Sequence, residues 1–221
     1  MGISAGPDMV QDGLVLTLNA SDRLSYISGS TTWNDVSGQG NNALLINGPT
    51  FNSSNGGSIV FDGSNDYGNV NSLANVLSNS AYTKIAWFRP TSFSTNNNII
   101  SGDVSGMHAF WLAGGNKLNA GHNGSWSTVV STTTLALNTW YFGAVTFNTT
   151  NGWVLYLNGV RESTSSNTTT FTGTGKILIG AYVLADNLFT GRISFAQVYN
   201  RVLSDVEIQQ NYNALKSRFN L

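Results

Sequence analysis

The chain has 221 residues, of which only 10% are charged, and its formal net charge is −1. A nucleic-acid partner requires clustered lysine and arginine, so the ten scattered basic residues exclude phosphate-backbone binding. The absence of cysteine excludes disulfides and thiolate metal sites. The 6 Trp, 8 Tyr and 11 Phe supply enough apolar surface for a large core, and the 28 Asn indicate many turns.

Short apolar segments, separated by clusters of Gly, Asn and Ser, have the pattern of strands. In chain order they are 14–19, 43–47, 58–63, 84–90, 109–114, 127–132, 139–148, 152–162, 176–181 and 190–200. Within 152–162 the pair Asn158-Gly159 follows an alternating strand, and Asn-Gly is the strongest two-residue hairpin signal. Evenly spaced short strands with such turns predict an all-β fold, a two-sheet antiparallel jelly-roll sandwich.

The last predicted element is a helix over about 204–219, in the segment "LSDVEIQQNYNALKSRF". Ser204 and Glu207 form a capping box, and Leu203 and Ile208 are placed as a hydrophobic staple. Apolar residues then recur on one face of the helix: Ile208, Tyr212, Leu215 and Phe219. We expect this helix to pack on the sandwich.

The sequence contains no linker, internal repeat or second composition block, so residues 1–221 are predicted to form a single domain. The opening "MGISAGPDMVQDG" lacks the charged and apolar regions of a signal peptide, and no apolar run is long enough to span a membrane. The protein is therefore expected to be assembled in a cytoplasm, without a membrane partner.

Residues for catalysis are scarce. A glycoside hydrolase needs two carboxylates about 5 to 10 Å apart at the scissile bond. Of the two glutamates, Glu162 follows the hairpin turn and Glu207 is used in the helix cap. Asp62 and Asp66 lie in "FDGSNDY", which has the pattern of a turn. The two histidines lack a nucleophile elbow and paired metal spacing, so we predict no catalytic residue, no zinc site and no enzyme activity.

A ligand-binding stretch is predicted at 101–127, "SGDVSGMHAFWLAGGNKLNAGHNGSWS". Carbohydrate sites combine an aromatic ring, which stacks on the C–H face of a sugar, with hydrogen bonds from Asn, Asp and His. The candidates here are Asp103, His108, Trp111, His122, Asn123 and Trp126. Trp111 alternates with Phe110, so one of the two must point inward, and we favour Trp111 as the core residue. Trp126 is assigned to a Gly/Ser loop, and the histidines are interpreted as surface or turn residues.

Five motifs occur along the chain in this order: "DGLVLTLNAS", "WNDVSGQGNN", "FDGSNDY", "W-x-LYLNG" and "FTGRISFAQVYNRVLSDVEIQQNYNALKSRF". Together they resemble the laminin-G-like branch of the concanavalin A-like lectin/glucanase superfamily, in the variety found in structural proteins of tailed phages, cyanophages especially. The resemblance covers nearly all of 8–220 and implies the same two-sheet jelly roll. It also implies ligand binding or a particle-surface role, without guaranteeing catalysis.

From this resemblance we predict a non-enzymatic phage virion surface protein that binds host cell-surface glycans, as a lectin-like adhesin on the capsid or tail. One alternative is a capsid decoration or cement protein without carbohydrate binding, and a weaker one is a glycan hydrolase. An adhesin exposes Trp126 or Trp111 in a groove, whereas a cement protein buries its aromatics and docks by a flat apolar patch. Other virion proteins and further copies of the chain are the remaining expected partners.

The loop 33–42, "WNDVSGQGNN", belongs to the skeleton that the resemblance implies. Asp35 is interpreted as a turn residue that accepts hydrogen bonds from backbone N–H groups, in preference to a calcium ligand. Gly38 and Gly40 supply the positive φ values of this structural turn.

Calcium is the one cofactor that the resemblance suggests, and the fold is not expected to require it. Some laminin-G-like domains bind calcium at the rim of the sandwich, and Asp103 with Asn123 is the candidate pair here. Asn19 and Asn65 stand where the family often has Asp, which weakens a metal site at those positions.

Overall fold

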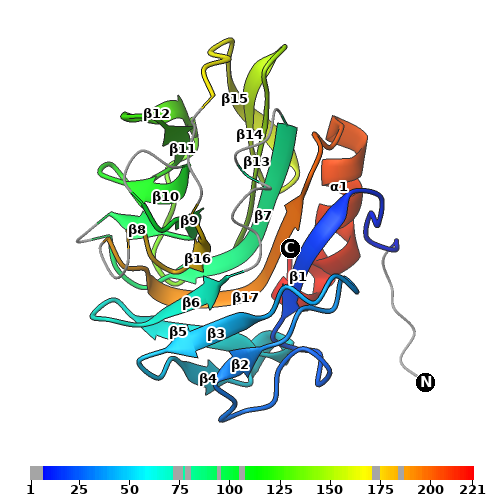
Figure 1. Ribbon diagram of the computed structural model, residues 1–221, viewed down its shortest axis with the longest axis vertical. Coiled ribbons are helices and arrows are strands. Elements are labelled where there is room, and N and C mark those ends of the chain that lie inside the picture. The colour runs from blue at the N-terminus through cyan, green and yellow to red at the C-terminus, as the bar shows by residue number, and fades with distance from the viewer. Residues whose placement is uncertain are drawn as a thin grey trace.

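The computed structural model describes residues 7–71, 77, 81–93, 96–104, 108–170, 175–183 and 187–221. The expectation about a signal peptide rests partly on residues 1–6, which lie outside the described residues. Across the described part the strands form three antiparallel sheets that make two layers (Figure 1).

The largest sheet has the strand order β15-β14-β13-β7-β17-β5-β4, and β1 also pairs with β17. Its strands are β1 (Leu14–Asn19), β4 (Thr50–Asn52), β5 (Ser58–Asp62), β7 (Ala81–Pro90), β13 (Tyr141–Asn148), β14 (Gly152–Leu157), β15 (Val160–Ser165) and β17 (Thr190–Tyr199). The predicted hairpin at Asn158-Gly159 joins β14 to β15, and both of its residues have positive φ. β17, the last strand in the sequence, therefore lies in the middle of this sheet.

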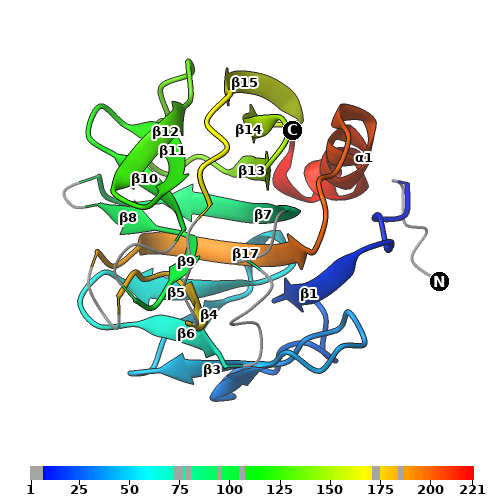
Figure 2. The ribbon, with the colours of Figure 1, turned by 45° about the horizontal axis from the view of Figure 1, so that its top comes forward.

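Two smaller sheets make up the second layer. One has the order β12-β11-β10-β8, and the other has the order β2-β3-β6-β16-β9. Their strands are β2 (Thr32–Trp33), β3 (Ala43–Ile46), β6 (Tyr67–Val70), β8 (Asn97–Asn98), β9 (Ile100–Gly102), β10 (Ala109–Ala113), β11 (Lys117–His122), β12 (Ser125–Val130) and β16 (Ile177–Ile179). Two backbone hydrogen bonds join these sheets: Ile99 N donates to Phe110 O at 2.8 Å, and Gly102 N donates to His108 O at 3.0 Å. Figure 2 shows β10–β12 of this layer facing β13–β15 of the large sheet.

The large sheet is covered on both faces, and β7 is accordingly buried along almost its whole length. One face packs against the second layer, through fully buried residues such as Phe88, Val145 and Phe110. The other face packs against the C-terminal helix, through Trp87 and Phe142. Strands covered on both sides lose the usual alternation of apolar and polar residues.

The C-terminal helix α1 (Asp205–Leu215) continues as a 3-10 turn, η2 (Lys216–Phe219), and a second such turn is η1 (Ser54–Gly56). The predicted capping box is present: Ser204 N donates to Glu207 Oε2 at 2.8 Å, and Ser204 Oγ accepts from Glu207 N. Ile208 and Phe219 of the predicted apolar face are buried against the large sheet. No helix in the described part of the chain is long and apolar enough to cross a membrane.

The predicted fold class is confirmed, and each predicted segment contains a strand. The very short strands were not predicted, and neither was β11. In β11 the two apolar residues, Leu118 and Ala120, are separated by Asn119 and followed by Gly121, so the segment has no apolar run. β12 begins at Ser125, two residues before the predicted segment. Trp126 therefore belongs to a strand, and its assignment to a Gly/Ser loop is wrong.

The helix cap makes stability depend on pH. The Arg201 guanidinium, whose Nη2 lies 2.6 Å from Glu207 Oε1, and the bonds from Ser204 lower the pKa of the Glu207 carboxyl to about 2. A carboxyl whose folded pKa lies below its unfolded value of about 4.5 stabilises the fold above pH 4.5, and this contribution is lost as the pH falls towards 2. We expect Glu207→Gln to cost about 1 kcal/mol at pH 7, roughly 2–4 °C in Tm.

The test is a series of melting curves for both proteins between pH 7 and pH 2. The difference in Tm should shrink as the pH falls below about 5, because only the parent protein loses a favourable charge. Asp8→Asn, at an exposed carboxyl, is the matched control and should change Tm little at any pH. A Tm difference that stays constant down to pH 3 would contradict the assigned role of the Glu207 charge.

Candidate functional site

The hairpin β10–β11 places one aromatic residue on the outer face of the second layer. Phe110 is paired with Ala120 and Trp111 with Asn119, and successive side chains of a strand point to opposite faces. Phe110 is fully buried between the layers, while Trp111 is partly exposed. The expectation that Trp111 is the core residue of the pair is therefore wrong, because Phe110 takes the inner position.

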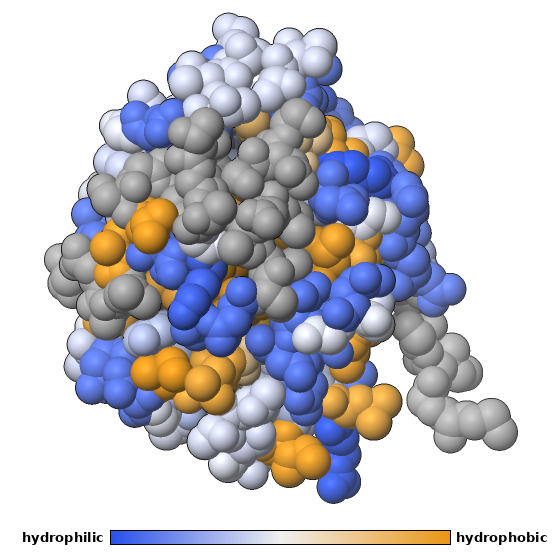
Figure 3. Space-filling model, in the orientation of Figure 1, coloured by the Kyte–Doolittle hydropathy of each residue, from blue (hydrophilic) through white to orange (hydrophobic). Residues whose placement is uncertain are grey.

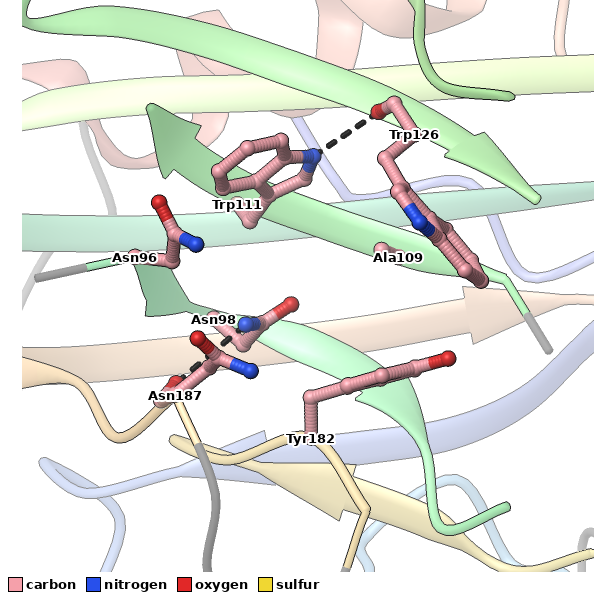
Figure 4. Close-up of a pocket in the computed structure, with 7 residues that line it drawn as sticks. All are labelled: Asn96, Asn98, Ala109, Trp111, Trp126, Tyr182 and Asn187. Atoms are coloured by element: carbon pink, nitrogen blue, oxygen red, sulfur yellow. Dashed lines mark hydrogen bonds between the residues drawn. The ribbon is translucent and has the colours of Figure 1, made fainter. Parts of the chain in front are cut away.

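Trp126 reaches Trp111 because β12 approaches β11 closely at Gly121. A Cβ at position 121 would lie 1.9 Å from the carbonyl oxygen of Ser125, so any side chain there would push β12 away. The close approach lets Trp111 Nε1 donate a 2.8 Å hydrogen bond to the Trp126 carbonyl oxygen. Figure 4 shows this bond, with the Trp126 indole extending from β12 towards Tyr182. The two rings meet at 66°, with centroids 5.5 Å apart.

These three aromatic residues border a pocket of about 130 Å³, which we call the aromatic pocket. It is lined by Asn96, Asn98, Ala109, Trp111, Trp126, Tyr182 and Asn187 (Figure 4). Asn98 is held in place, because its Oδ1 accepts from Ser101 Oγ at 2.7 Å and its Nδ2 donates to the Asn187 carbonyl oxygen at 3.2 Å. Trp126 and Tyr182 are partly exposed and Asn96 is exposed, so the pocket opens to the surface.

The described side chains that line the aromatic pocket are uncharged, and they combine apolar rings with polar amides. Indole and phenol rings offer apolar faces to C–H groups, and each also carries one polar atom. Asparagine amides offer both a donor and an acceptor, which matches hydroxyl groups that donate and accept in turn. The pocket therefore suits a polyhydroxylated ring with one apolar face.

The predicted histidines lie on the inner side of the same two strands. His108 comes just before β10 and two residues before Phe110, so its side chain points to the same inner face. It is fully buried. Its Nδ1 lies 2.8 Å from Nζ of the fully buried Lys84. Burial and the neighbouring Lys84 charge lower the pKa of His108 well below its usual range. The imidazole is therefore neutral at pH 7 and does not line the aromatic pocket.

His122 is also a core residue. It shares the inward parity of Ala120 on β11, is only 3% exposed, and meets Trp153 edge-on with ring centroids 4.7 Å apart. Its Nε2 contacts the carbonyl oxygen of Thr169. The interpretation of the two histidines as surface or turn residues is wrong, because alternation on the strands turns them inward.

The two candidate calcium ligands, Asp103 and Asn123, each hold a loop in place through a hydrogen bond to its backbone. Asp103 is 8% exposed, and its Oδ1 accepts a 2.7 Å hydrogen bond from Lys176 N. Asn123 donates from Nδ2 to the Thr170 carbonyl oxygen at 2.6 Å. Neither side chain lines the aromatic pocket. Among the described residues no group of three His, Asp or Glu side chains is arranged to hold a metal, and calcium binding at Asp103 and Asn123 stays a prediction.

Asp35 ties its loop to the sandwich. Its carboxylate oxygens accept hydrogen bonds of 2.8–2.9 Å from the backbone N–H groups of Thr17, Ser37 and Asn41. Gly38 and Gly40 have φ values of 86° and 74°. These three backbone bonds account for a carboxylate in a glycine-rich loop without a ligand.

The carboxylates considered for catalysis also serve the fold. Glu162 Oε2 accepts from the backbone N–H groups of Thr132 and Thr133 at 2.8 and 2.9 Å. Asp66 is buried, and its Oδ2 accepts from Asp62 N at 3.2 Å. Among the described residues, no carboxylate lines the aromatic pocket.

Four residues of the pocket lie outside the predicted stretch 101–127: Asn96, Asn98, Tyr182 and Asn187. Tyr182 and Asn187 follow β16 and lie more than fifty residues from Trp126 in the sequence. They reach the pocket because backbone bonds attach this segment to β8, as in the 3.2 Å bond from Asn98 N to Asn187 O. The only local signal was the pair of asparagines in "NNN" at 96–98, which by itself indicates no more than a turn.

Comparisons with known proteins agree with this architecture. The model of a family described as the concanavalin A-like lectin/glucanases superfamily matches residues 62–209. Domain 4 of AbnA, an extracellular arabinanase from Geobacillus stearothermophilus solved with arabinotriose, superposes with a TM-score of 0.73 at 16% identity, over 90% of this chain and 98% of that one. No curated protein matches in sequence.

Two larger proteins also contain this fold. A sialidase mutant from Trypanosoma rangeli with trans-sialidase activity gives a TM-score of 0.72 at 15% identity, over 96% of this chain but only 35% of the sialidase. The binding domain of botulinum neurotoxin DC, solved with rat synaptotagmin II, gives 0.69 at 16% identity, over 93% of this chain and 52% of that domain. This chain thus spans about a third and about half of these two structures, and at such low identity the likeness shows the fold alone. Since the family model matches more than half of the sequence, the chain belongs to the concanavalin A-like lectin/glucanases superfamily.

Proposed function

We propose that this chain is a non-catalytic lectin-like domain that binds glycans at the aromatic pocket. The observation that carries the proposal is the arrangement of Trp111, Trp126 and Tyr182, which leave apolar ring surface exposed beside three asparagine amides. The cement alternative expects docking by a flat apolar patch, whereas these rings border a pocket. The complex of the arabinanase domain with arabinotriose supports the proposal, because a protein of the same fold was solved with a short glycan.

The proposal that this domain binds glycans without hydrolysing them rests on the residues that line the aromatic pocket. Glycoside hydrolysis needs two carboxylates at the scissile bond, and the described residues that line the pocket include none. Glu162 and Glu207 are each engaged in hydrogen bonds elsewhere in the fold. A sugar held in this pocket would therefore find no acid and no nucleophile among those side chains.

The wider role that we propose is recognition of host cell-surface glycans from the outside of a tailed-phage particle. Its support is the resemblance of the sequence motifs to phage structural proteins. This role can be tested directly by mass spectrometry and electron microscopy of phage particles purified from the source of the sequence. Detection of the chain on the capsid or tail surface is the expected result, and its absence from particles contradicts the role without affecting glycan binding.

Glycan binding is tested on an array of immobilised oligosaccharides with the parent protein and Trp126→Ala. We expect binding of the parent, and at least a thirtyfold loss for the variant, because truncating a central aromatic residue typically costs 2 kcal/mol or more. Val130→Ala is the matched control, since Val130 is exposed on the same strand β12 but lies outside the pocket. Equal binding by the parent and Trp126→Ala would move the site elsewhere, and no binding to any glycan would reject the proposal.

A further inference from the structure

A second hollow adjoins the aromatic pocket. It has a volume of about 590 Å³ and lies between β12 and β15, and we call it the hydroxyl pocket. Trp111 and Trp126 line both pockets, so the two adjoin at this pair. β12 is an edge strand of the second layer and β15 is an edge strand of the large sheet. Figure 1 shows both strands at the same end of the molecule.

The hydroxyl pocket differs from the aromatic pocket in its side chains. Besides the shared tryptophans it is lined mainly by Ser125, Ser127, Thr128, Ser165 and Asn167. Thr128 Oγ1 donates to the Ser125 carbonyl oxygen at 2.8 Å, and Asn167 Oδ1 accepts from Thr169 N at 2.9 Å, so both side chains are oriented. In Figure 3 the end of the molecule that carries β12 and β15 is mostly pale, which is the colour of residues that are neither strongly polar nor strongly apolar.

The sizes of the two pockets indicate an extended ligand. Sites that enclose a small ligand usually have about 300–1,000 Å³, and the aromatic pocket, with about 130 Å³, is well below this range. A single ring seated there would therefore leave part of itself uncovered. The adjoining 590 Å³ provides hydrogen-bonding surface where a second and a third unit would lie.

The lining also indicates the charge of the ligand. Every described residue that lines either pocket is uncharged. A sugar carboxylate that leaves water needs a cationic partner or several N–H donors, and without them its desolvation is costly. Hydroxyl groups have no such requirement, because Ser, Thr and Asn side chains replace their bonds to water.

We infer that the two pockets form one groove for a neutral oligosaccharide of at least two units, with little affinity for acidic sugars. This inference rests on the proposed function, since it specifies the ligand of the same site. Trp126 lies at the junction, one unit occupies the aromatic pocket and the following units lie along β12 towards Asn167.

The experiment is isothermal titration with gluco-, galacto-, manno- and arabino-oligosaccharides of one to four units, and with the uronic-acid counterparts of the first three series. Affinity for the bound neutral series should rise at least tenfold from one unit to three, and the uronic-acid series should bind at least tenfold more weakly. Asn167→Ala should weaken binding of the trisaccharide about five- to tenfold and leave the single sugar unchanged. Thr168→Ala is the matched control, at an exposed neighbouring residue outside the lining.

The outcomes separate this inference from the proposed function. If single sugars bind as tightly as trisaccharides, or if uronic-acid chains bind best and lose affinity in Trp126→Ala, the groove assignment is overturned while glycan binding stands. If Asn167→Ala and Thr168→Ala behave alike, the chain of units runs in another direction and the assignment again fails. If no probe binds although the array shows binding of another glycan, the groove assignment fails while glycan binding stands. If the array also shows no binding, both are rejected.

Discussion

A chain that ends after Arg201 is expected to fail to fold and to aggregate, because it lacks the helix that covers one face of the large sheet. The ring of Phe219 stacks on Trp87 with centroids 4.2 Å apart and planes 16° from parallel. Leu203, Ile208 and Phe219 are each at most 4% exposed. Burial of one such side chain contributes about 1.5–3 kcal/mol, so their removal alone costs roughly 5–9 kcal/mol. Total stabilities are about 5–15 kcal/mol, so the loss is decisive.

Circular dichroism and size-exclusion chromatography of the truncated chain provide the measurement. A chain that ends after Phe219 is the matched control and should stay folded, because Asn220 and Leu221 are exposed. Phe219→Ala in the full chain should lower stability by about 3–5 kcal/mol. A monomeric, cooperatively melting chain truncated after Arg201 would show that the sheet does not need this cover.

The second large effect is expected at Gly121, where Ala should disable the binding site while the rest of the sandwich stays folded. A methyl group there meets the Ser125 carbonyl oxygen at 1.9 Å, so β12 must move away from β11. The shift breaks the bond from Trp111 Nε1 to the Trp126 carbonyl and displaces the Trp126 ring. We expect a loss of about 1–3 kcal/mol in stability, roughly 2–12 °C in Tm, and loss of measurable glycan binding.

Gly114→Ala is the matched control. Gly114 lies in the turn at the other end of the β10–β11 hairpin, and a Cβ there would meet no atom within 4 Å. Its melting temperature and its binding to the array should match those of the parent protein. If Gly121→Ala binds glycans as the parent does, then the close approach of β12 is not what positions the site.

The elements that could be predicted from the sequence are those with a local signal. The capping box of Ser204 and Glu207 and the hairpin at Asn158-Gly159 each depend on a few adjacent residues, and both are present. The long strands β7 and β17 were also visible, because most of their residues are buried and each contains a cluster of apolar and aromatic residues. Short strands such as β8 have only two residues and no pattern of their own.

The candidate binding site was predictable only in part, because the sequence did not determine which of two adjacent strand residues points inward. Trp111 and Phe110 are both aromatic, and only the register of β10 against β11 assigns Phe110 to the core. The same alternation turns His108 and His122 inward, although they lie close to the tryptophans in the sequence. Tyr182 and Asn187 join the site through pairing between segments far apart in the chain, for which no local pattern exists.

The central place of β17 in the large sheet determines when the chain can fold during its synthesis. β17 is the shared neighbour of β1, β5 and β7, so before residues 190–199 leave the ribosome the sheet exists only as separate pieces. At about 5–20 residues per second, roughly 5–20 s pass between the synthesis of β7 and that of β17. Throughout that interval β7 presents an unpaired edge, flanked by apolar residues such as Trp87, to other nascent chains. Ribosome pausing ahead of residue 190 therefore prolongs the period in which this protein is most prone to aggregate.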